Sequence, residues 1–530
     1  MAILLGDSFS YQGQKPLDSR IKYNTLAEMV AMADSTLYDG CIAYCVGEDK
    51  NYQWKSTNTV DATTGKWREL EAGGGSEYTA GYGIDITENE ISTERMQSSE
   101  IGDLTLNEPG TPFDPTIVPE VYAFQIDTSV SNPATAVTPF DSPYGCDNLN
   151  FTPAHMDFST GKFDYGSWTG EEFFSPKPCV LNYDGTVAYY LDPDDYTKKA
   201  DGTSATIGTS CPGNVMVEFP TIWFKRWRVN NINYCVISNK KLDKDFKAYA
   251  HMDINGGVAD KIYISAYDGS YISGKLRSIS GISANNTGKI STSNYICNFR
   301  TRQQEVDLAK ANNVRTDCEG WNVWHKAERD MVNDLLILLG MSLNTQAVFG
   351  RGRDTGYSST TSTGVVATGS MNTKGLFWGE NAGAAGVKVF GIENWWGNLW
   401  KNLLGWINDN GQQKIKMTFG REDGSLVRGY NFTGEGYIPI SGAIPSGTSG
   451  GYVNKWEYSE YGMIPYQVSG SESTYLCDGL WFDNARVDYA LVGGASSDGV
   501  RCGAFCLALS ALASVAGWHG GAALSFKSLA

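Results

Sequence analysis

The chain has 530 residues, with 42 Lys and Arg against 59 Asp and Glu, so its formal net charge is −17 at pH 7. This acidic balance argues against nucleic acid as a partner, because phosphate binding depends on clustered basic side chains. No apolar run approaches the roughly 20 residues of a membrane-spanning helix, and the length exceeds what one hydrophobic core usually supports, so we expect several domains and no membrane insertion.

The first predicted unit covers residues 1–72. Its first residues lack the basic and apolar stretches of a secretory signal. Thr25 and Glu28 have the spacing of a capping box, which predicts a short helix over residues 26–33. Strand-like runs follow at 40–46 and 52–56. The unit ends at the Ala-Gly-Gly-Gly-Ser sequence of residues 72–76. This sequence predicts a flexible break, because none of its residues has a side chain that could anchor it to a hydrophobic core.

Residues 73–116 are predicted to form a Gly-rich linker with a small hairpin. The hairpin falls within residues 78–92, where Gly-containing turns flank the alternating Ile84 and Ile86. A hairpin of this size is not stable alone, so it indicates identical neighbours and a homo-oligomer. An ordinary linker hairpin is the alternative that the pattern leaves open.

The third predicted unit covers residues 117–530, with a candidate sub-boundary near residue 206. Strand-like runs occur at 121–126, 187–191, 215–219, 234–237 and 261–266. One amphipathic helix is predicted from Trp321 to Leu339, ending at Gly340. The chain contains 60 Gly, 15 Trp and 29 Tyr but few helix-periodic segments. We therefore expect a β-rich α+β fold.

Cysteine and tryptophan usage both indicate buried structure. The 11 cysteines are scattered without the paired spacing of a zinc site, which favours buried thiols made in a reducing cytoplasm. Trp395, Trp396, Trp400 and Trp406 fall within one short stretch, and we expect them to belong to the core.

Residues 481–526, called here the C-terminal segment, combine a bulky framework with small residues that follow no helix or strand period. The framework consists of Trp481, Gly493, Gly494, Gly503, Phe505, Leu507, Leu509, Leu512, Trp518, Leu524 and Phe526. A fixed frame with arbitrary residues between its members is typical of a binding surface whose contacts vary.

Residues 391–400, Gly-Ile-Glu-Asn-Trp-Trp-Gly-Asn-Leu-Trp, resemble the Gly-Leu-Tyr-Asp-Met-x-Gly-Asn-Val-Trp motif of the formylglycine-generating-enzyme branch of the C-type lectin fold. Gly391, Gly397, Asn398 and Trp400 are identical to the motif. The resemblance implies a C-type lectin-like fold for residues 117–530, although residues 127–210 match less specifically.

Other parts of the chain resemble phage-associated proteins. Gly493-Gly494, Gly503-Ala-Phe505 and Trp518-x-x-Gly-x-x-Leu-Ser-Phe526 are similar to the variable region of diversity-generating retroelement target proteins. The N-terminal unit, with Asp7-Ser-Phe-Ser and residues 16–20, resembles the attachment end of phage tail fibres, and the hairpin resembles their shaft.

The retroelement resemblance makes a compositional prediction. In that family adenines of the template are randomised, so that AAC codons become NNC, which never encodes Met, Gln, Lys, Glu or Trp. Residues 482–520 contain no Met, Gln, Lys or Glu, and their one Trp, Trp518, is a framework residue. A plain segment rich in Ala, Gly and Ser is the alternative explanation.

The residues that we take to be variable form the predicted ligand-binding surface, called here the candidate face, and all of them belong to the set that NNC codons permit. Its members are Phe482, Ala485, Asp488, Ala495, Ser496, Ser497, Asp498, Val500, Arg501, Cys506, Ala508, Ser510, Ala511, Ser514, Val515, Gly517, His519 and Gly520. Phe482, Arg501 and His519 are the expected energetic anchors.

Enzymatic alternatives have weaker support in the sequence. The enzyme branch of the fold holds copper with paired cysteines, and Cys502 and Cys506 lie in the corresponding region, but their spacing is one residue shorter than in that family. The four histidines lie in no nucleophile or metal motif, and the Trp-Asn-Asp of calcium-binding lectins is interrupted at residues 406–409. We expect no catalytic residue, no metal site and no cofactor.

These inferences predict a phage tail receptor-binding protein that is located in the virion tail and made in the cytoplasm of the bacterial host. The N-terminal unit would bind other tail proteins, the hairpin would join three copies into a homotrimer, and the candidate face would bind a protein or glycan receptor on the host surface. A copper oxidase of the formylglycine-generating type and a purely structural virion protein are the alternatives.

Overall fold

The computed structural model describes two units of the chain, residues 1–93 and 94–530. The described residues are 22–31, 37, 41–48, 50–69, 84–87, 90–93, 119–171, 176–253, 255–285, 290, 294–314, 320–357, 364–442 and 450–527. The N-terminal motifs at residues 7–10 and 16–20 and the Gly-rich break at 72–76 lie outside these ranges.

The described residues of the first unit up to residue 69 form a four-stranded sheet and one helix. The sheet order is β1 (Lys22–Tyr23), β2 (Cys41–Cys45), β3 (Lys50–Trp54) and β4 (Trp67–Glu69). Helix α1 (Leu26–Val30) begins at the predicted capping box, in which Thr25 Oγ1 accepts the Glu28 amide at 3.3 Å. Met29, Trp54 and Trp67 belong to its core. The predicted helix and strands of this unit are confirmed within a few residues at each end.

The predicted hairpin is present as strands β5 (Ile84–Thr87) and β6 (Glu90–Thr93). The strands pair antiparallel, with Ile86 opposite Ile91. The described structure contains a single copy of the chain, so the trimer stays a prediction.

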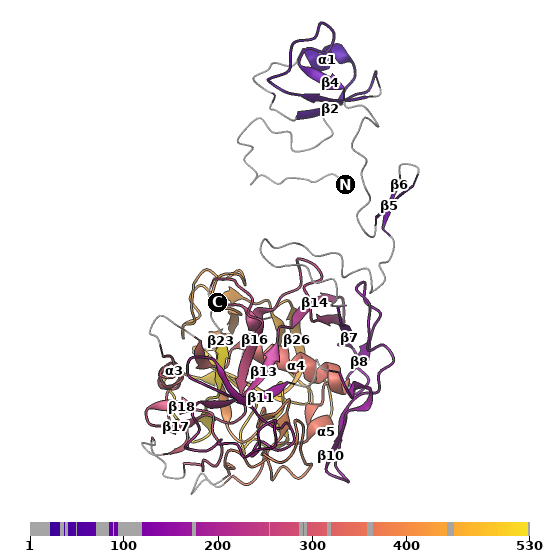
Figure 1. Cartoon of the computed structure of the whole chain (residues 1–530). Helices are drawn as coiled ribbons and strands as arrows, with labels where there is room; N and C mark the ends of the chain where they lie inside the picture. Colours follow the sequence, from indigo (N-terminus) through magenta and orange to yellow (C-terminus); the bar gives the residue numbers. More distant parts are fainter. Residues whose placement is uncertain are drawn as a thin grey trace. The chain divides into compact units, whose positions relative to one another are not determined.

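The larger unit is β-rich with few helices among its described residues (Figure 1). One sheet has the order β12 (Val187–Tyr190), β11 (Lys177–Leu181), β13 (Asn214–Pro220), β16 (Lys261–Ser265), β32 (Leu524–Lys527) and β20 (Trp321–Val323). A second has the order β14 (Trp223–Val229), β15 (Ile232–Ser238), β7 (Val121–Asp127) and β8 (Val137–Pro139). The five strand-like runs predicted from residue 117 onward are confirmed.

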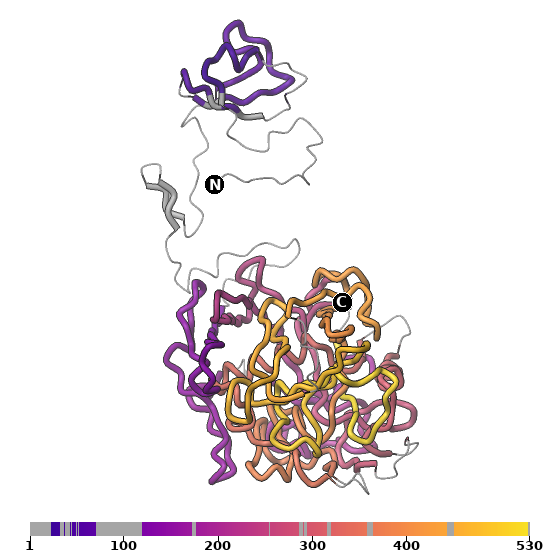
Figure 2. Tube along the Cα trace, turned by 180° about the vertical axis from the view of Figure 1, so that it is seen from behind, coloured from indigo at the N-terminus to yellow at the C-terminus, as the bar shows by residue number. Residues whose placement is uncertain are grey.

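The largest sheet holds most of the C-terminal segment. Its order is β25 (Ile438–Pro439), β24 (Gln412–Ile415), β23 (Trp400–Asp409), β29 (Val487–Val492), β30 (Leu507–Ala511), β28 (Gly479–Phe482), β26 (Gly450–Ser459) and β27 (Gly462–Val468), and β31 (Gly520–Gly521) pairs with β23. Seen from behind, the last part of the chain, in yellow, runs across the larger unit on the side facing the viewer (Figure 2).

Short strand pairs and helices complete the larger unit. The pairs are β9 (His155–Asp157) with β10 (Lys162–Asp164) and β21 (Lys388–Val389) with β22 (Ile392–Glu393), and β17 (Ser270–Ile272) lies between β18 (Lys275–Arg277) and β19 (Tyr295–Ile296). The helices are α3 (Arg302–Lys310), α4 (Lys326–Gly340) and α5 (Thr345–Phe349), with 3-10 turns η2 (Gly166–Trp168), η4 (Tyr249–His251) and η5 (Gly499–Arg501). None of the described helices is both long and apolar enough to cross a membrane.

Helix α4 corrects the predicted helix at its start. Residues 321–323 form strand β20 instead, because Trp321 pairs with Phe526 of the last strand. The helix begins after His325, whose amide donates to Glu328 Oε2 at 3.0 Å. It is buried along its length and contacts β7, β23 and β27, so it lies between two sheets.

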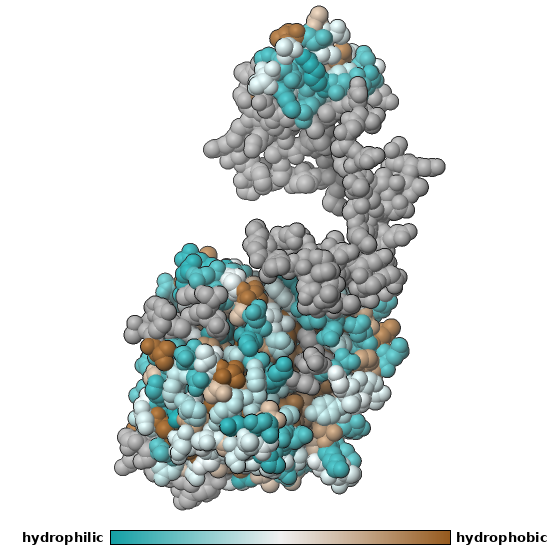
Figure 3. All heavy atoms as spheres, in the orientation of Figure 1, coloured by the Kyte–Doolittle hydropathy of each residue, from teal (hydrophilic) through white to brown (hydrophobic). Residues whose placement is uncertain are grey.

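The tryptophan-rich stretch belongs to the core, as predicted. Trp395 and Trp396 have no exposed surface, and Trp406 is also buried. The indole of Trp395 donates to Asn333 Oδ1 at 2.9 Å, which satisfies its polar group. On the face of the larger unit drawn in Figure 3, hydrophobic residues lie scattered among hydrophilic ones.

Candidate functional site

The candidate face is built on adjacent strands of the largest sheet. Strand β28 runs parallel to β30, with Trp481 opposite Ala508, and β29 runs antiparallel to β30, with Leu491 also opposite Ala508. Strands β28, β29 and β30 of the C-terminal segment therefore form one continuous piece of sheet, and the residues that connect and follow these strands carry the remaining members of the face. Strand β32, at the end of the segment, belongs to another sheet.

Two framework glycines make the turn after β29 possible. Gly493 and Gly494 have φ values of +90° and +81°, where other residues are strained. A Cβ on Gly494 would lie 2.5 Å from Cys502 Sγ. These glycines therefore belong to the frame, as the sequence predicted.

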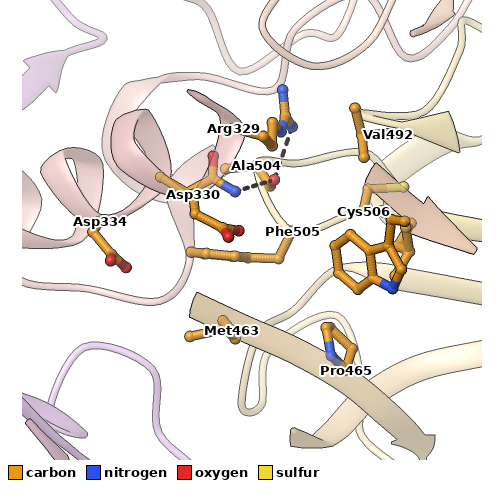
Figure 4. A pocket seen from close by; sticks show the side chains of 12 residues that line it. Arg329, Asp330, Asp334, Met463, Pro465, Val492, Ala504, Phe505 and Cys506 are labelled. Carbon is orange, nitrogen blue, oxygen red and sulfur yellow. Dashed lines mark hydrogen bonds between the residues drawn. The ribbon is translucent and has the colours of Figure 1, made fainter. Parts of the chain in front are cut away.

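Buried side chains outside the C-terminal segment hold the backbone of its loops. Arg329 Nη2 and Asn333 Nδ2, both on α4, donate to the carbonyl oxygen of Ala504 at 2.8 and 2.9 Å (Figure 4). Asp478 Oδ2 accepts the amide of Phe505 at 2.8 Å. Burial raises the pKa of the Asp478 carboxyl and lowers the pKa of Arg329 to about 9.

Other side chains from outside the segment donate to its backbone in the same way. Gln346 Nε2 donates to the carbonyl of Val500 at 3.2 Å, Asn298 Nδ2 to that of Trp518 at 3.1 Å, and Asn408 Nδ2 to that of Leu509 at 3.3 Å. Such contacts are made to backbone atoms, so they do not depend on which side chains the segment carries. These anchors lie far from their partners in sequence, so no local pattern identifies them.

Eleven members of the candidate face retain exposed or partly exposed side chains or backbone. They are Ala485, Ser497, Asp498, Val500, Arg501, Ser510, Ala511, Ser514, Val515, Gly517 and His519. We call them the surface group. Asp498 is fixed within it, because Oδ2 accepts the Ala495 amide at 2.7 Å.

The other seven members are buried, which corrects their assignment to the surface. They are Phe482, Asp488, Ala495, Ser496, Cys506, Ala508 and Gly520. Ala495, Cys506 and Ala508 pack in one small cluster with Trp400 and Leu491. A ligand on the surface does not reach these side chains in this structure.

Phe482 and Trp481 exchange their predicted roles. Successive residues of a strand point to opposite faces. Phe482 points into the main core and is 3% exposed, whereas Trp481 is half-buried. The expected anchor is therefore part of the frame, and a residue assigned to the frame lies at the surface.

Trp481 is the centre of an aromatic group at the surface, called here the Trp481 cluster. Its ring meets Trp400 edge to face, with centroids 5.4 Å apart. The Arg501 guanidinium lies 5.7 Å from the ring of Trp481 and 5.5 Å from the ring of Tyr452. Arg501 is exposed, so this cation–π arrangement presents its charge to solvent.

A second aromatic group, the Trp518 cluster, lies in the loop before β31. Tyr357 stacks on Trp518 with centroids 4.5 Å apart and an interplanar angle of 12°. His519 meets Trp518 edge to face at 5.6 Å. Burial, followed by the charge of Arg302, lowers the pKa of His519, so its ring is neutral near pH 7. Tyr357 is 41% exposed and was not predicted, because it lies far from the C-terminal segment in sequence.

The cysteines of the segment are in an unreactive environment. Cys502 and Cys506 are both buried, and burial raises the pKa of each thiol well above its usual value. A metal-binding or nucleophilic cysteine needs the opposite shift. Among the described residues, no three His, Cys, Asp or Glu side chains are placed to hold a metal ion.

The cavity beside Cys506 is too small for a substrate. It is lined by Arg329, Trp406 and Cys506, among others, and has a volume of about 20 Å³ (Figure 4). This is room for about one water molecule.

No protein-family model matches this chain, and a search of curated proteins found no match.

Proposed function

We propose that the chain is a phage tail receptor-binding protein whose surface group, together with the Trp481 and Trp518 clusters, binds a ligand on the host surface. The proposal includes a C-type lectin-like fold for residues 117–530. The motif at residues 391–400 supports it, since its tryptophans occupy the core, as a fold-defining motif requires.

The observation that carries the proposal is the anchoring of the C-terminal segment. Arg329, Asn333, Asp478 and Gln346 bind its backbone from outside, so the loops keep their course when their own exposed side chains change. A surface whose residues vary needs a backbone that is held in place by residues that do not vary with it.

The composition of the surface also supports a binding role. Trp, Tyr and Arg contribute most of the energy at protein interfaces. Trp481, Tyr452, Arg501, Trp518 and Tyr357 supply these types, with small side chains of the surface group among them. The rigid rings provide contact area, and the small residues adjust its shape.

The N-terminal unit and the hairpin serve assembly in this proposal. The N-terminal unit binds other tail proteins, and the β5–β6 hairpin brings three copies together in the virion tail. Contacts through small side chains are individually weak, and three linked copies raise the effective concentration of the face.

The test is binding of the purified, fluorescently labelled chain to a panel of bacterial strains. We expect binding to at least one strain, and at least a tenfold loss in the double variant Arg501→Ala, His519→Ala with an unchanged melting temperature. Arg421→Ala, at an exposed arginine outside the segment, is the matched control. Wild-type binding by the double variant, or binding to no strain, would contradict the proposal.

A further inference from the structure

A hollow of about 300 Å³ with a mixed polar and apolar lining adjoins the candidate face, and the function proposed above does not use it. It is lined mainly by Asn344, Gln346, Arg351, Asn381, Glu472 and Val500. Its volume lies at the lower end of the range of ligand pockets, roughly 300–1,000 Å³. Val500 is the single lining residue that belongs to the candidate face, so the hollow lies where the frame meets the surface group.

The walls of the hollow are fixed by hydrogen bonds. Asn344 Oδ1 accepts the Ala347 amide at 2.9 Å, and Gln346 Nε2 donates to the Val500 carbonyl at 3.2 Å. The carbonyl of Asp354 accepts the Gly499 amide at 3.1 Å, which ties η5 to the segment that carries Arg351. The side chains of Asn344 and Gln346 are therefore preorganised, which lowers the cost of binding.

The charges of the hollow disfavour an anionic ligand. Arg351 is neutralised by Asp354, because Nε and Nη2 both lie 2.8 Å from Oδ2. Glu472 forms no ion pair within the described part of the chain and is exposed. Among the described lining residues, none offers an unpaired positive charge, so the lining provides no favourable partner for a phosphate or carboxylate.

The lining also disfavours an apolar ligand. The lining is mixed: Ala347, Cys477 and Val500 contribute apolar surface, and three side-chain amides, a carboxylate and the Ser473 hydroxyl supply donors and acceptors. Burying these groups against an apolar molecule would leave them unsatisfied. Amides and a carboxylate at short range are suited to a ligand with several neighbouring hydroxyls.

The geometry points to a saccharide site: we propose that the hollow binds one neutral sugar ring of a host surface glycan. Asn344, Gln346, Asn381 and Glu472 form hydrogen bonds with the sugar hydroxyls, and residue 500 adjusts the shape of one wall. The inference rests on the proposed function and deepens it, because it names the class of ligand that the frame itself recognises.

The test uses the full-length chain and a panel of methyl glycosides of neutral hexoses and N-acetylhexosamines, followed by saturation-transfer NMR and titration. We expect saturable binding of at least one glycoside with a dissociation constant near the millimolar range, and no binding of the corresponding sugar phosphate. Glu472→Gln and Asn381→Ala, both at exposed positions, should weaken binding at least tenfold. Glu435→Gln, an exposed glutamate elsewhere, should have no effect.

Two results would overturn the inference. One is the absence of binding to every neutral glycoside of the panel, and the other is equal binding by the wild type, Glu472→Gln and Asn381→Ala. Failure here is distinguishable from failure of the proposed function. If cells bind through Arg501 and His519 but no glycoside binds, the saccharide site is wrong and the receptor-binding function stands. If a glycoside binds at Glu472 while the Arg501 and His519 variant binds cells normally, the saccharide site stands and the proposed receptor-binding role of the candidate face is wrong.

Discussion

The guanidinium of Arg329 donates to the carbonyl oxygen of Ala504, 175 residues further along the chain, at 2.8 Å. This bond joins helix α4 to the backbone of the C-terminal segment. Asn333, one helical turn later, donates to the same oxygen. The frame of the candidate face is therefore set by a helix that contributes nothing to its surface.

The first prediction concerns this attachment. Asn333→Leu removes the bond to Ala504 and leaves the buried Trp395 indole without its acceptor. We expect the free energy of unfolding to fall by about 2–4 kcal/mol, because one hydrogen bond is lost and a buried polar group is left unsatisfied. Thermal unfolding measures this as a lower melting temperature, with Asn381→Leu at the surface as the control. An unchanged melting temperature would show that α4 does not hold the segment.

The second prediction separates Phe482 from Trp481. Phe482→Ala should lower the stability by about 3–5 kcal/mol, because it empties a core position. Trp481→Ala should lower it less and should reduce cell binding more, because its half-buried ring supports Arg501. Both variants are compared in cell binding below their melting temperatures. Stronger loss of binding in Phe482→Ala would restore the original assignment of the anchor.

The third prediction concerns pH. Burial, followed by the charge of Lys527, lowers the pKa of His251 to about 3. The unfolded chain, with a histidine pKa of about 6.5, then binds more protons between pH 6.5 and 3. The folded state loses stability as the pH falls through this window, by about 1.4 kcal/mol per unit. Relative to His251→Leu, the wild-type melting temperature should therefore fall between pH 7 and 4. A constant difference would show that the His251 pKa is not lowered.

The fourth prediction tests the copper oxidase alternative. Cys502 and Cys506 are buried, and the pKa of each thiol is raised. Neither should therefore react with iodoacetamide at pH 8 in the folded chain. The reaction time is the time in which the unfolded chain reacts fully. Peptide mapping by mass spectrometry locates the modified residues. Copper titration of the reduced protein should show no tight uptake that Cys502→Ser, Cys506→Ser removes. Uptake lost in that variant would favour the oxidase.

Local sequence patterns predict the elements whose contacts are close in sequence. The capping box at Thr25 and Glu28 and the strand runs after residue 117 are examples. The start of α4 was misplaced because Trp321 pairs with Phe526, a contact between distant residues that no local period reveals.

In the candidate site, too, local patterns predict some features, whereas contacts between distant residues determine others. The sequence distinguishes the framework glycines, because their positive φ angles restrict the residue type. Successive side chains of a strand alternate in direction, which places Trp481 and Phe482 on opposite faces of β28. This alternation does not show which of the two faces packs against the core. Tyr357 and the anchors Arg329 and Asn333 meet the segment only through the tertiary fold, so their roles required the structure.

The most direct test of a diversified face on a fixed frame is deep sequencing of codons 481–526 in many isolates of the gene, together with its neighbourhood. The account predicts a near-identical template repeat, a reverse transcriptase gene, and substitutions concentrated at codons of the surface group, with Gly493, Gly494, Phe505 and Trp518 unchanged. Substitutions spread evenly over frame and surface codons, with no repeat or reverse transcriptase nearby, would contradict it.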